Sequence, residues 1–244
     1  MDTPQPTAKD IQARVLHRDG LMLVIDKPAG IPVHRGPKGG ANLEASFDAL
    51  RFGLPRPPVL AHRLDRDTSG CLVLGRHRKA TASLGLLFKH NKISKTYWAV
   101  VEGGPVEDEG TIDIPLGRLN AERGWWQKPD PNGLPSTTAW KVMGRGNGLA
   151  WLALEPITGR THQLRVHCVA MGWPIVGDNI YGTQASLRRL RDEPYVPRAG
   201  APSLHLHARE VVIPLSRNKP PVVVTAPIPD HLRERLKACG WNEA

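Results

Sequence analysis

The chain has 244 residues, and 40% of them are hydrophobic, so it can bury a sizeable core and is not disordered as a whole. Its 33 lysines and arginines outnumber its 23 acidic residues, and the net charge of +10 favours a polyanionic partner, most commonly nucleic acid. Charge alone does not exclude a basic enzyme without such a partner. No apolar run approaches the roughly 20 residues that a membrane-spanning helix needs, so we expect no membrane partner.

The first half of the chain predicts strands and helices in succession. Residues 1–13 are expected to form a flexible lead-in. Apolar runs predict strands over residues 21–25, 71–74 and 94–102. A helix is expected after Asn42, a potential N-cap, and another over residues 78–90, with Leu84, Leu87 and Phe88 on its apolar side.

The second half is richer in strands. They are predicted over residues 137–143, 149–155, 205–213 and 221–226. Helices are predicted over residues 161–171 and from Asp230, as a cap, through Leu236. Because neighbouring strands often lack a helix between them, the pattern favours an α+β fold with a largely antiparallel sheet. We expect residues 14–244 to form a single domain.

Three cysteines, Cys71, Cys168 and Cys239, provide no paired disulfide framework. Cys71 and Cys168 lie in apolar runs, which predicts buried thiols. This usage suits a reducing cytosol, and the first residues lack the pattern of a secretion signal. We therefore expect a cytoplasmic location.

Residues 118–136 form a polar insertion that contains Arg123, Trp125, Trp126 and Lys128. Basic residues interleaved with tryptophans can contact phosphates and stack on unpaired bases. A surface loop whose tryptophans pack back onto the sheet is an equal alternative. A second basic segment, Ser186–Arg191, is expected to be a solvated helix face.

Asp65 is the candidate nucleophile in the most informative stretch, His62–Gly70. The stretch turns into the apolar run Cys71–Leu74, which predicts a buried strand. Neighbouring arginines favour the ionised form of this carboxyl group, and carboxylates can form covalent intermediates. Taken by itself, an aspartate at a turn more often only accepts hydrogen bonds from turn amides.

The stretch His62–Gly70 resembles the signature of the RluA-type pseudouridine synthases. The resemblance continues in further motifs that follow the order expected for the family: Asp26–His34, Lys95–Gly103, Pro156–His167, Gly177–Gly182 and Leu206–Ala208. An ordered set of this kind is far more specific than any one short pattern. The resemblance implies the pseudouridine synthase core, a bent mixed sheet with an RNA-binding cleft across its middle.

The reaction that the resemblance implies is the isomerisation of uridine to pseudouridine in RNA. It needs no redox chemistry and no added group, so no cofactor and no metal are expected. By resemblance, Asp65 is the nucleophile, which attacks either C6 of uracil or C1′ of ribose, and Arg165 pairs with its carboxylate. Tyr97 resembles the tyrosine that packs against the target base and that can assist removal of the C5 proton. Without the motifs, a surface arginine and a core tyrosine would be the ordinary interpretations of these two residues.

Five further residues are candidates for contacts with RNA. The resemblance implies that Arg63 enters the space left by the flipped base. His62 is expected to support the loop or a phosphate, and Lys27 and His34 to line the RNA path. Leu206 is expected to form an apolar wall beside the base.

Two rival functions fit parts of the sequence. The pairs His162 with His167 and His205 with His207 suggest a metallohydrolase, but convergent carboxylate or thiolate ligands are not evident. An RNA-binding module without catalysis fits the charge but does not explain the intact motifs around Asp65. We expect a stand-alone, monomeric catalytic domain that acts on a stem-loop of tRNA or 23S-type rRNA.

Overall fold

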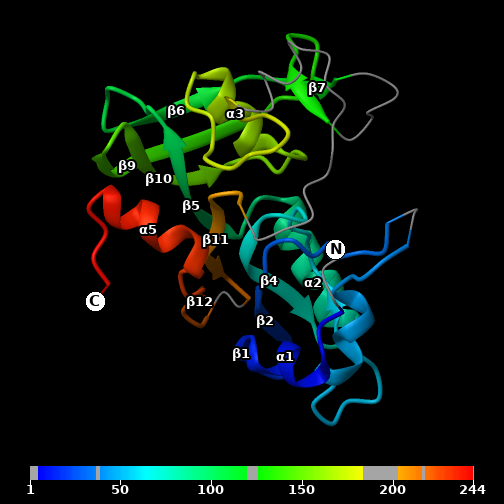
Figure 1. Cartoon of the computed structure of the whole chain (residues 1–244). Coiled ribbons are helices and arrows are strands. Elements are labelled where there is room, and N and C mark those ends of the chain that lie inside the picture. Colours follow the sequence, from blue (N-terminus) through cyan, green and yellow to red (C-terminus); the bar gives the residue numbers. More distant parts are fainter. Residues whose placement is uncertain (1–4, 37–38, 120–125, 184–202, 216–217, 244) are drawn as a thin grey trace. The chain divides into compact units, whose positions relative to one another are not determined.

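The computed structural model describes residues 5–36, 39–119, 126–183, 203–215 and 218–243, and structural statements refer to these residues. The fold is α+β with a large, mostly antiparallel sheet, as predicted (Figure 1). Contacts divide the chain into two compact units, each described by itself. The first unit comprises the described parts of Met1–Lys95 and Ala208–Pro227; the second comprises those of Thr96–Arg198, Ser203–His207 and Ile228–Ala244. The single-domain expectation for residues 14–244 stays a prediction.

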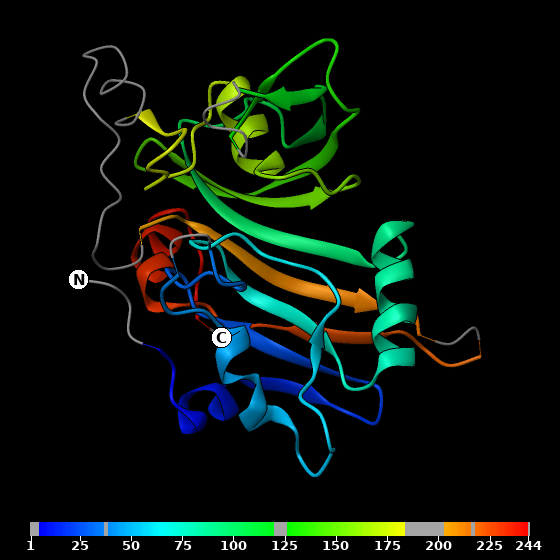
Figure 2. The ribbon, with the colours of Figure 1, turned by 90° about the vertical axis from the view of Figure 1, so that its right-hand side faces the viewer.

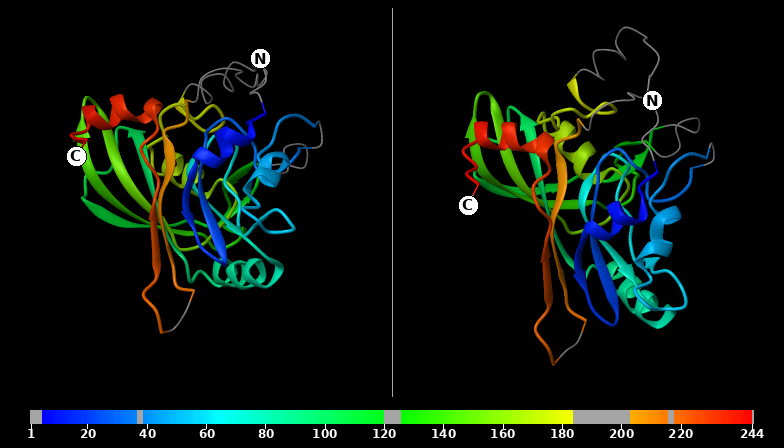
Figure 3. Two further views of the ribbon diagram at one scale, coloured as in Figure 1. Left: turned by 90° about the horizontal axis from the view of Figure 1, so that it is seen from below. Right: turned by 60° about the horizontal axis from the view of Figure 1, so that its bottom comes forward.

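The first unit contains an antiparallel arrangement of short strands. Its strands are β1 (Val15–Arg18), β2 (Met22–Lys27), β3 (Val59–Leu60), β4 (Ser69–Gly75), most of β11 (Leu206–Ile213) and β12 (Val222–Thr225). β2 pairs with β1 and β4, and β11 and β12 run side by side (Figure 3). Every residue of β4 is buried, which explains why its central run Cys71–Leu74 is continuously apolar rather than alternating.

Two short helices occupy the N-terminal part of this unit. The helix α1 (Ala8–Ala13) lies within the predicted lead-in, and Thr7 and Asp10 form a reciprocal capping box at its start. Its Ile11 is fully buried, and Gln12 Nε2 donates a hydrogen bond to Ala49 O at 2.7 Å. Ala49 belongs to η1 (Glu44–Leu50), a 3₁₀ helix that stands where we expected a helix.

The helix α2 (Arg78–Lys89) forms where the apolar spacing predicted it and packs against β4 and β3 (Figure 2). Leu84 is fully buried, and Leu87 and Phe88 pack against the core of the unit. The close packing continues at Gly70, whose φ is +104°. A Cβ at this position would collide with the backbone of Ala208 in β11, so only glycine fits.

The second unit contains four antiparallel strands in the order β5-β10-β9-β6. They are β5 (Ser94–Glu102), of which Thr96 onward belongs to this unit, β6 (Glu109–Asp113), β9 (Thr137–Gly146) and β10 (Leu149–Pro156). β7 (Leu116–Arg118) and β8 (Gln127–Pro129) form a separate two-stranded sheet; β7 ends where the predicted insertion begins, and β8 lies within the insertion. Leu152, Leu154 and Ala99 are fully buried in the core between these strands and α3 (Gln163–Ala170).

The helix α5 (Asp230–Ala238) packs against β10 through Leu232 and Leu236, both fully buried. Its N-cap is Pro229, so the prediction that Asp230 caps the helix was wrong by one position. The end of α5 reaches β9 at two glycines, Gly144 and Gly146, where a Cβ would collide with the carbonyl oxygens of Cys239 and Ala238.

The described residues include no helix with the length and apolar character needed to cross a bilayer. The three cysteines are buried as free thiols, which confirms the prediction for Cys71 and Cys168.

Candidate active site

Asp65 lies at the start of a tight turn that leads into β4. The turn is closed by a hydrogen bond from Thr68 N to Asp65 O at 3.3 Å, and Gly30 N donates to Arg66 O at 3.0 Å. Thr68 is buried, whereas the Asp65 side chain belongs to a partly exposed residue. Asp65 is therefore a partly exposed residue at the start of a turn whose end, at Thr68, is buried.

Lys27, at the end of β2, fixes this turn from inside. Its side chain is fully buried, and its Nζ donates to three carbonyl oxygens: Pro28 at 2.9 Å, Arg66 at 2.8 Å and Thr68 at 2.8 Å. Burial lowers the pKa of Lys27 to about 7, and the charges of Asp67 and Asp65 oppose this shift. This placement differs from the expected one along an RNA path, because the ammonium group is enclosed by backbone.

His62 anchors the other side of the turn. Its Nε2 accepts a hydrogen bond from Val73 N in β4 at 3.0 Å, and its ring stacks on Phe88 of α2 with centroids 4.2 Å apart. Burial, assisted by the charge of Lys95, lowers the pKa of His62 to about 3. The ring is therefore neutral with its proton on Nδ1. These contacts favour loop support, one of the two roles expected for it.

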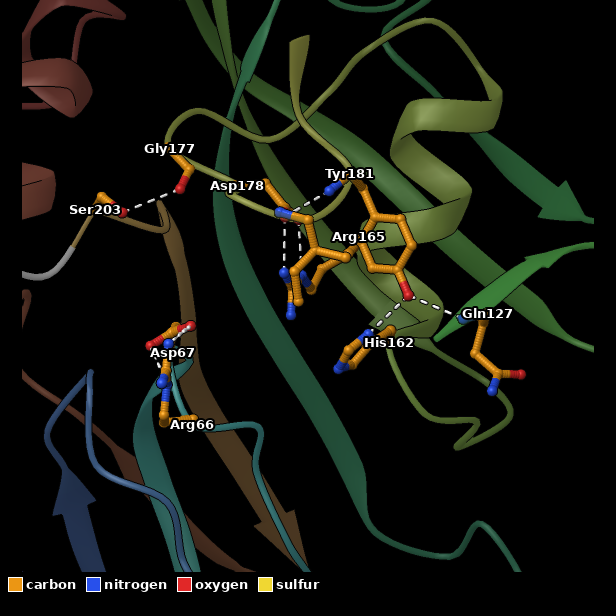
Figure 4. A network of polar contacts seen from close by, with 10 residues as sticks. Arg66, Asp67, Gln127, His162, Arg165, Gly177, Asp178, Tyr181 and Ser203 are labelled. Atoms are coloured by element: carbon orange, nitrogen blue, oxygen red, sulfur yellow. Dashed lines mark hydrogen bonds and ion pairs between the residues drawn. The ribbon is translucent and has the colours of Figure 1, made fainter. Parts of the chain in front are cut away.

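The remaining first-unit candidates, Arg63 and His34, are near the surface. Arg63 is exposed. Arg66 pairs with the adjacent Asp67, with Nε to Oδ1 at 3.0 Å and Nη2 to Oδ2 at 3.3 Å (Figure 4). His34 Nδ1 lies 2.6 Å from Glu44 Oε2 at the start of η1, and both side chains are about half exposed.

Arg165 and Asp178 form a buried ion pair in the second unit (Figure 4). Arg165 Nε and Nη2 donate to the two carboxylate oxygens of Asp178, each at 2.7 Å. Asp178 Oδ1 also accepts hydrogen bonds from Ile180 N and Tyr181 N, both at 2.9 Å. Burial opposes ionisation, but the Arg165 guanidinium and these hydrogen bonds outweigh it, so the pKa of Asp178 lies below its ordinary value.

The helix that carries Arg165 was predicted, but its surroundings were predicted only in part. Leu164 and Cys168 are buried, which agrees with the prediction of a buried thiol at Cys168. Met171, the last residue of the predicted helix, is 41% exposed, because α3 ends at Ala170. Asp178 was not identified as the partner of Arg165, although it belongs to the recognised motif Gly177–Gly182.

Tyr97 and Leu206 belong to one apolar cluster of the second unit. Tyr97 lies in β5 opposite Leu154 of β10 and packs, partly buried, against the cluster that includes Leu206. Leu164 and Cys168 of α3 belong to the same cluster. Tyr97 and the helix that carries Arg165 therefore share one core.

Two of the histidines that suggested a metal site, His167 and His205, contact other groups. His167 Nδ1 lies 2.9 Å from Thr138 Oγ1, and its Nε2 lies 3.0 Å from Ile114 O. His205 Nδ1 lies 2.8 Å from Ser203 O. In the parts of the chain that the structure describes, no three or more His, Cys, Asp or Glu side chains are grouped to hold a metal ion.

The predicted insertion contributes a side chain, that of Trp126, to a buried cluster. Trp126 is 3% exposed and packs with Leu116, Val166 and Tyr181. Of the two alternatives for the tryptophans, Trp126 therefore packs back onto the core and is not available for stacking on a base. Lys128 is exposed. Arg123, Trp125 and the segment Ser186–Arg191 lie outside the described residues.

Comparisons with known proteins agree with the resemblance drawn from the motifs. Residues 21–170 match the family described as RNA pseudouridylate synthase. The chain is 40% identical over 218 residues to an uncharacterised RNA pseudouridine synthase of Zymomonas mobilis subsp. mobilis, covering 88% of this chain and 94% of that protein. It is 33% identical to ribosomal large subunit pseudouridine synthase C of Vibrio vulnificus, covering 94% and 69%. The structure of human RNA pseudouridylate synthase domain containing 4 matches it with a TM-score of 0.75 and 27% identity, covering 95% of each chain.

Proposed function

The chain belongs to the RNA pseudouridylate synthase family, the RluA-type isomerases of RNA, and on that premise we propose that Asp65 is its catalytic nucleophile. Two contacts that order the turn support this assignment. The Lys27 ammonium donates hydrogen bonds to carbonyl groups of the turn. At the start of the turn, the His62 ring accepts a hydrogen bond from Val73 N in β4. A catalytic group must be held within a fraction of an ångström, and such support from a buried framework provides that precision.

The carboxylate of Asp65 opens the reaction at C1′ of the ribose or at C6 of the uracil. By either route the C1′–N1 bond breaks, the base rotates, and C5 bonds to C1′. The C5 proton is then lost and N1 gains one. Every bond that the nucleophile forms is broken again, so the carboxylate is regenerated without a cofactor.

Arg165 is proposed to orient the Asp65 carboxylate. A guanidinium has five N–H donors, so it can bind the two oxygens of Asp178 and a second carboxylate at the same time. Asp178 fixes the plane of the guanidinium, because both of its oxygens are engaged at 2.7 Å. The catalytic importance of Arg165 therefore depends on a partner that does not react.

The other candidates are assigned to the target base and its RNA. Tyr97 packs against the base and assists loss of the C5 proton, and Leu206 provides an apolar wall. Arg63, which is exposed, fills the space that the flipped base leaves. The exposed ring of His34 contacts the RNA backbone.

The substrate is proposed to be a stem-loop of large-subunit rRNA or of tRNA, bound by a cytoplasmic monomer. The net charge of +10 supports a polyanionic substrate. The name of the Vibrio vulnificus relative assigns that protein to the large ribosomal subunit, which favours rRNA among the two.

Pseudouridine mapping by carbodiimide-dependent primer-extension stops tests the function and the nucleophile together. Total tRNA and rRNA are compared from cells with the gene, without it, and with the variant Asp65→Asn. We expect the same site to be lost in both deficient strains, while the purified Asp65→Asn protein still binds the RNA. The matched control is Asp67→Asn, in the same turn, which should keep the site. A modified site that persists in the Asp65→Asn strain refutes the assignment of the nucleophile.

A further inference from the structure

Tyr181 joins the Arg165–Asp178 pair to two other elements of the second unit (Figure 4). Its backbone N donates to Asp178 Oδ1, and its ring lies beneath the guanidinium, 5.2 Å from Arg165 Cζ to the ring centroid. Tyr181 is only 5% exposed. The Tyr181 ring therefore restricts the guanidinium from its face, and the Asp178 carboxylate restricts it from its edge.

The Tyr181 hydroxyl reaches the insertion. It accepts a hydrogen bond from Gln127 N, the first residue of β8, at 2.9 Å. The neighbouring Trp126 packs in the same buried cluster as Tyr181, with ring centroids 6.4 Å apart. The β7–β8 sheet is therefore docked on the same side chain that lies beneath Arg165.

The hydroxyl also lies 2.8 Å from Nδ1 of His162, the residue before α3. His162 has a φ of +54°, a left-handed conformation that costs a residue other than glycine about 1 kcal/mol or more. His162 is 7% exposed, so its ring is held in place by its surroundings. The unfavourable backbone conformation thus aims the imidazole at the Tyr181 hydroxyl, three residues before Arg165 on the same segment.

From this arrangement we propose that Tyr181 is a positioning residue, which couples the docking of the β7–β8 sheet to the orientation of Arg165. Exposed groups of the insertion, such as Lys128, offer contacts for RNA phosphates. RNA that holds the insertion in its docked position would then stabilise the productive orientation of the arginine. The proposal rests on the proposed function, because it requires that Arg165 acts in catalysis.

Single-turnover kinetics with saturating enzyme test the coupling. Tyr181→Phe removes the hydroxyl and leaves the ring beneath Arg165, whereas Tyr181→Leu removes both. We expect Tyr181→Phe to lower the rate of pseudouridine formation about tenfold, as for loss of one or two hydrogen bonds that matter in the transition state. Tyr181→Leu should lower it further. RNA affinity should change much less than the rate in both variants.

Two more variants separate positioning from general destabilisation. His162→Asn removes the imidazole from the other end of the hydrogen bond, and asparagine tolerates the left-handed backbone. Because both changes break the same interaction, the double variant Tyr181→Phe with His162→Asn should be no slower than the slower single variant. The control Ile228→Val, a buried change beneath α5, should lower the melting temperature slightly and leave the rate unchanged.

Amide hydrogen exchange of the RNA-free protein provides a readout independent of activity. The peptide that contains Gln127 should exchange faster in Tyr181→Phe than in the parent protein or in Ile228→Val. Faster exchange with an unchanged rate would overturn the coupling, as would a loss of RNA affinity that accounts for the whole loss of activity. Retained activity in Asp65→Asn would instead refute the proposed nucleophile.

Discussion

The Asp65 turn and the Arg165 network both hold a charged group in place, but by opposite means. In the turn, backbone carbonyl groups converge on one buried ammonium, that of Lys27, and Arg63 remains exposed. In the network, side chains hold one another: Arg165, Asp178 and Tyr181 are each no more than 5% exposed.

The difference shows two ways in which a fold can hold a charged group in place. A backbone clamp fixes the path of a loop and leaves its side chains available to a substrate. A buried side-chain network fixes a charge in direction but needs every member, because a buried charge that loses its partner is strongly unfavourable. Breaking the side-chain network should therefore lower the free energy of unfolding more than breaking the backbone clamp.

The largest effect is expected for Asp178→Ala. This change leaves the Arg165 guanidinium buried without its carboxylate partner, which should lower the free energy of unfolding by about 3–5 kcal/mol. Replacing both residues with apolar ones, Arg165→Met with Asp178→Leu, should cost less than the single change. Urea denaturation followed by circular dichroism measures both. If the double variant is the less stable of the two, the pair is not held as a charge-compensated unit.

A smaller loss of stability is expected for Lys27→Met. The apolar side chain has a similar length but removes the ammonium from three carbonyl oxygens, of which Arg66 O keeps the hydrogen bond from Gly30 N, and we expect a cost of about 3 kcal/mol. The control is Lys79→Met on the exposed side of α2, which should change stability by less than about 0.5 kcal/mol. Equal stability of the two variants would show that the ammonium does not hold the turn.

The smallest effect should appear as a pH dependence due to His62. Its pKa is about 3 in the folded protein and about 6.5 when unfolded, so the unfolded state binds more protons between these values. Stability should therefore fall as the pH falls through this window, by about 1.6 kcal/mol between pH 6.5 and 5. In His62→Gln this dependence should be weaker. Parallel curves for the two proteins over this range would contradict the buried, neutral assignment.

Much of the fold could be predicted from the sequence because its local patterns are strong. The apolar runs that became β2 and β4 and the helical spacing of α2 are set by burial of neighbouring residues, which a short segment reveals. The helix α1 was missed because its six residues carry little periodicity, although the capping pair Thr7 and Asp10 was a usable signal.

The candidate site was predictable in its residues but less so in their contacts. Motif resemblance identified Arg165 but not the role of Asp178, because a pair separated by 13 residues is set by how two segments pack. Lys27 was assigned to the RNA path from its place in the motif Asp26–His34, and only the fold shows that it is buried against three carbonyl partners. Trp126 remained ambiguous because its burial depends on the core beneath the insertion.

Gly144 and Gly146 set a limit on how this protein can diverge. Both lie where the carbonyl groups at the end of α5 meet β9, and any side chain there would push the helix end away. A library that randomises β9 should therefore return glycine at these two positions under selection for folding alone. The exposed Lys141 of the same strand should accept many residues. Sequence variation in β9 is thus governed by a helix that follows it by more than 80 residues along the chain.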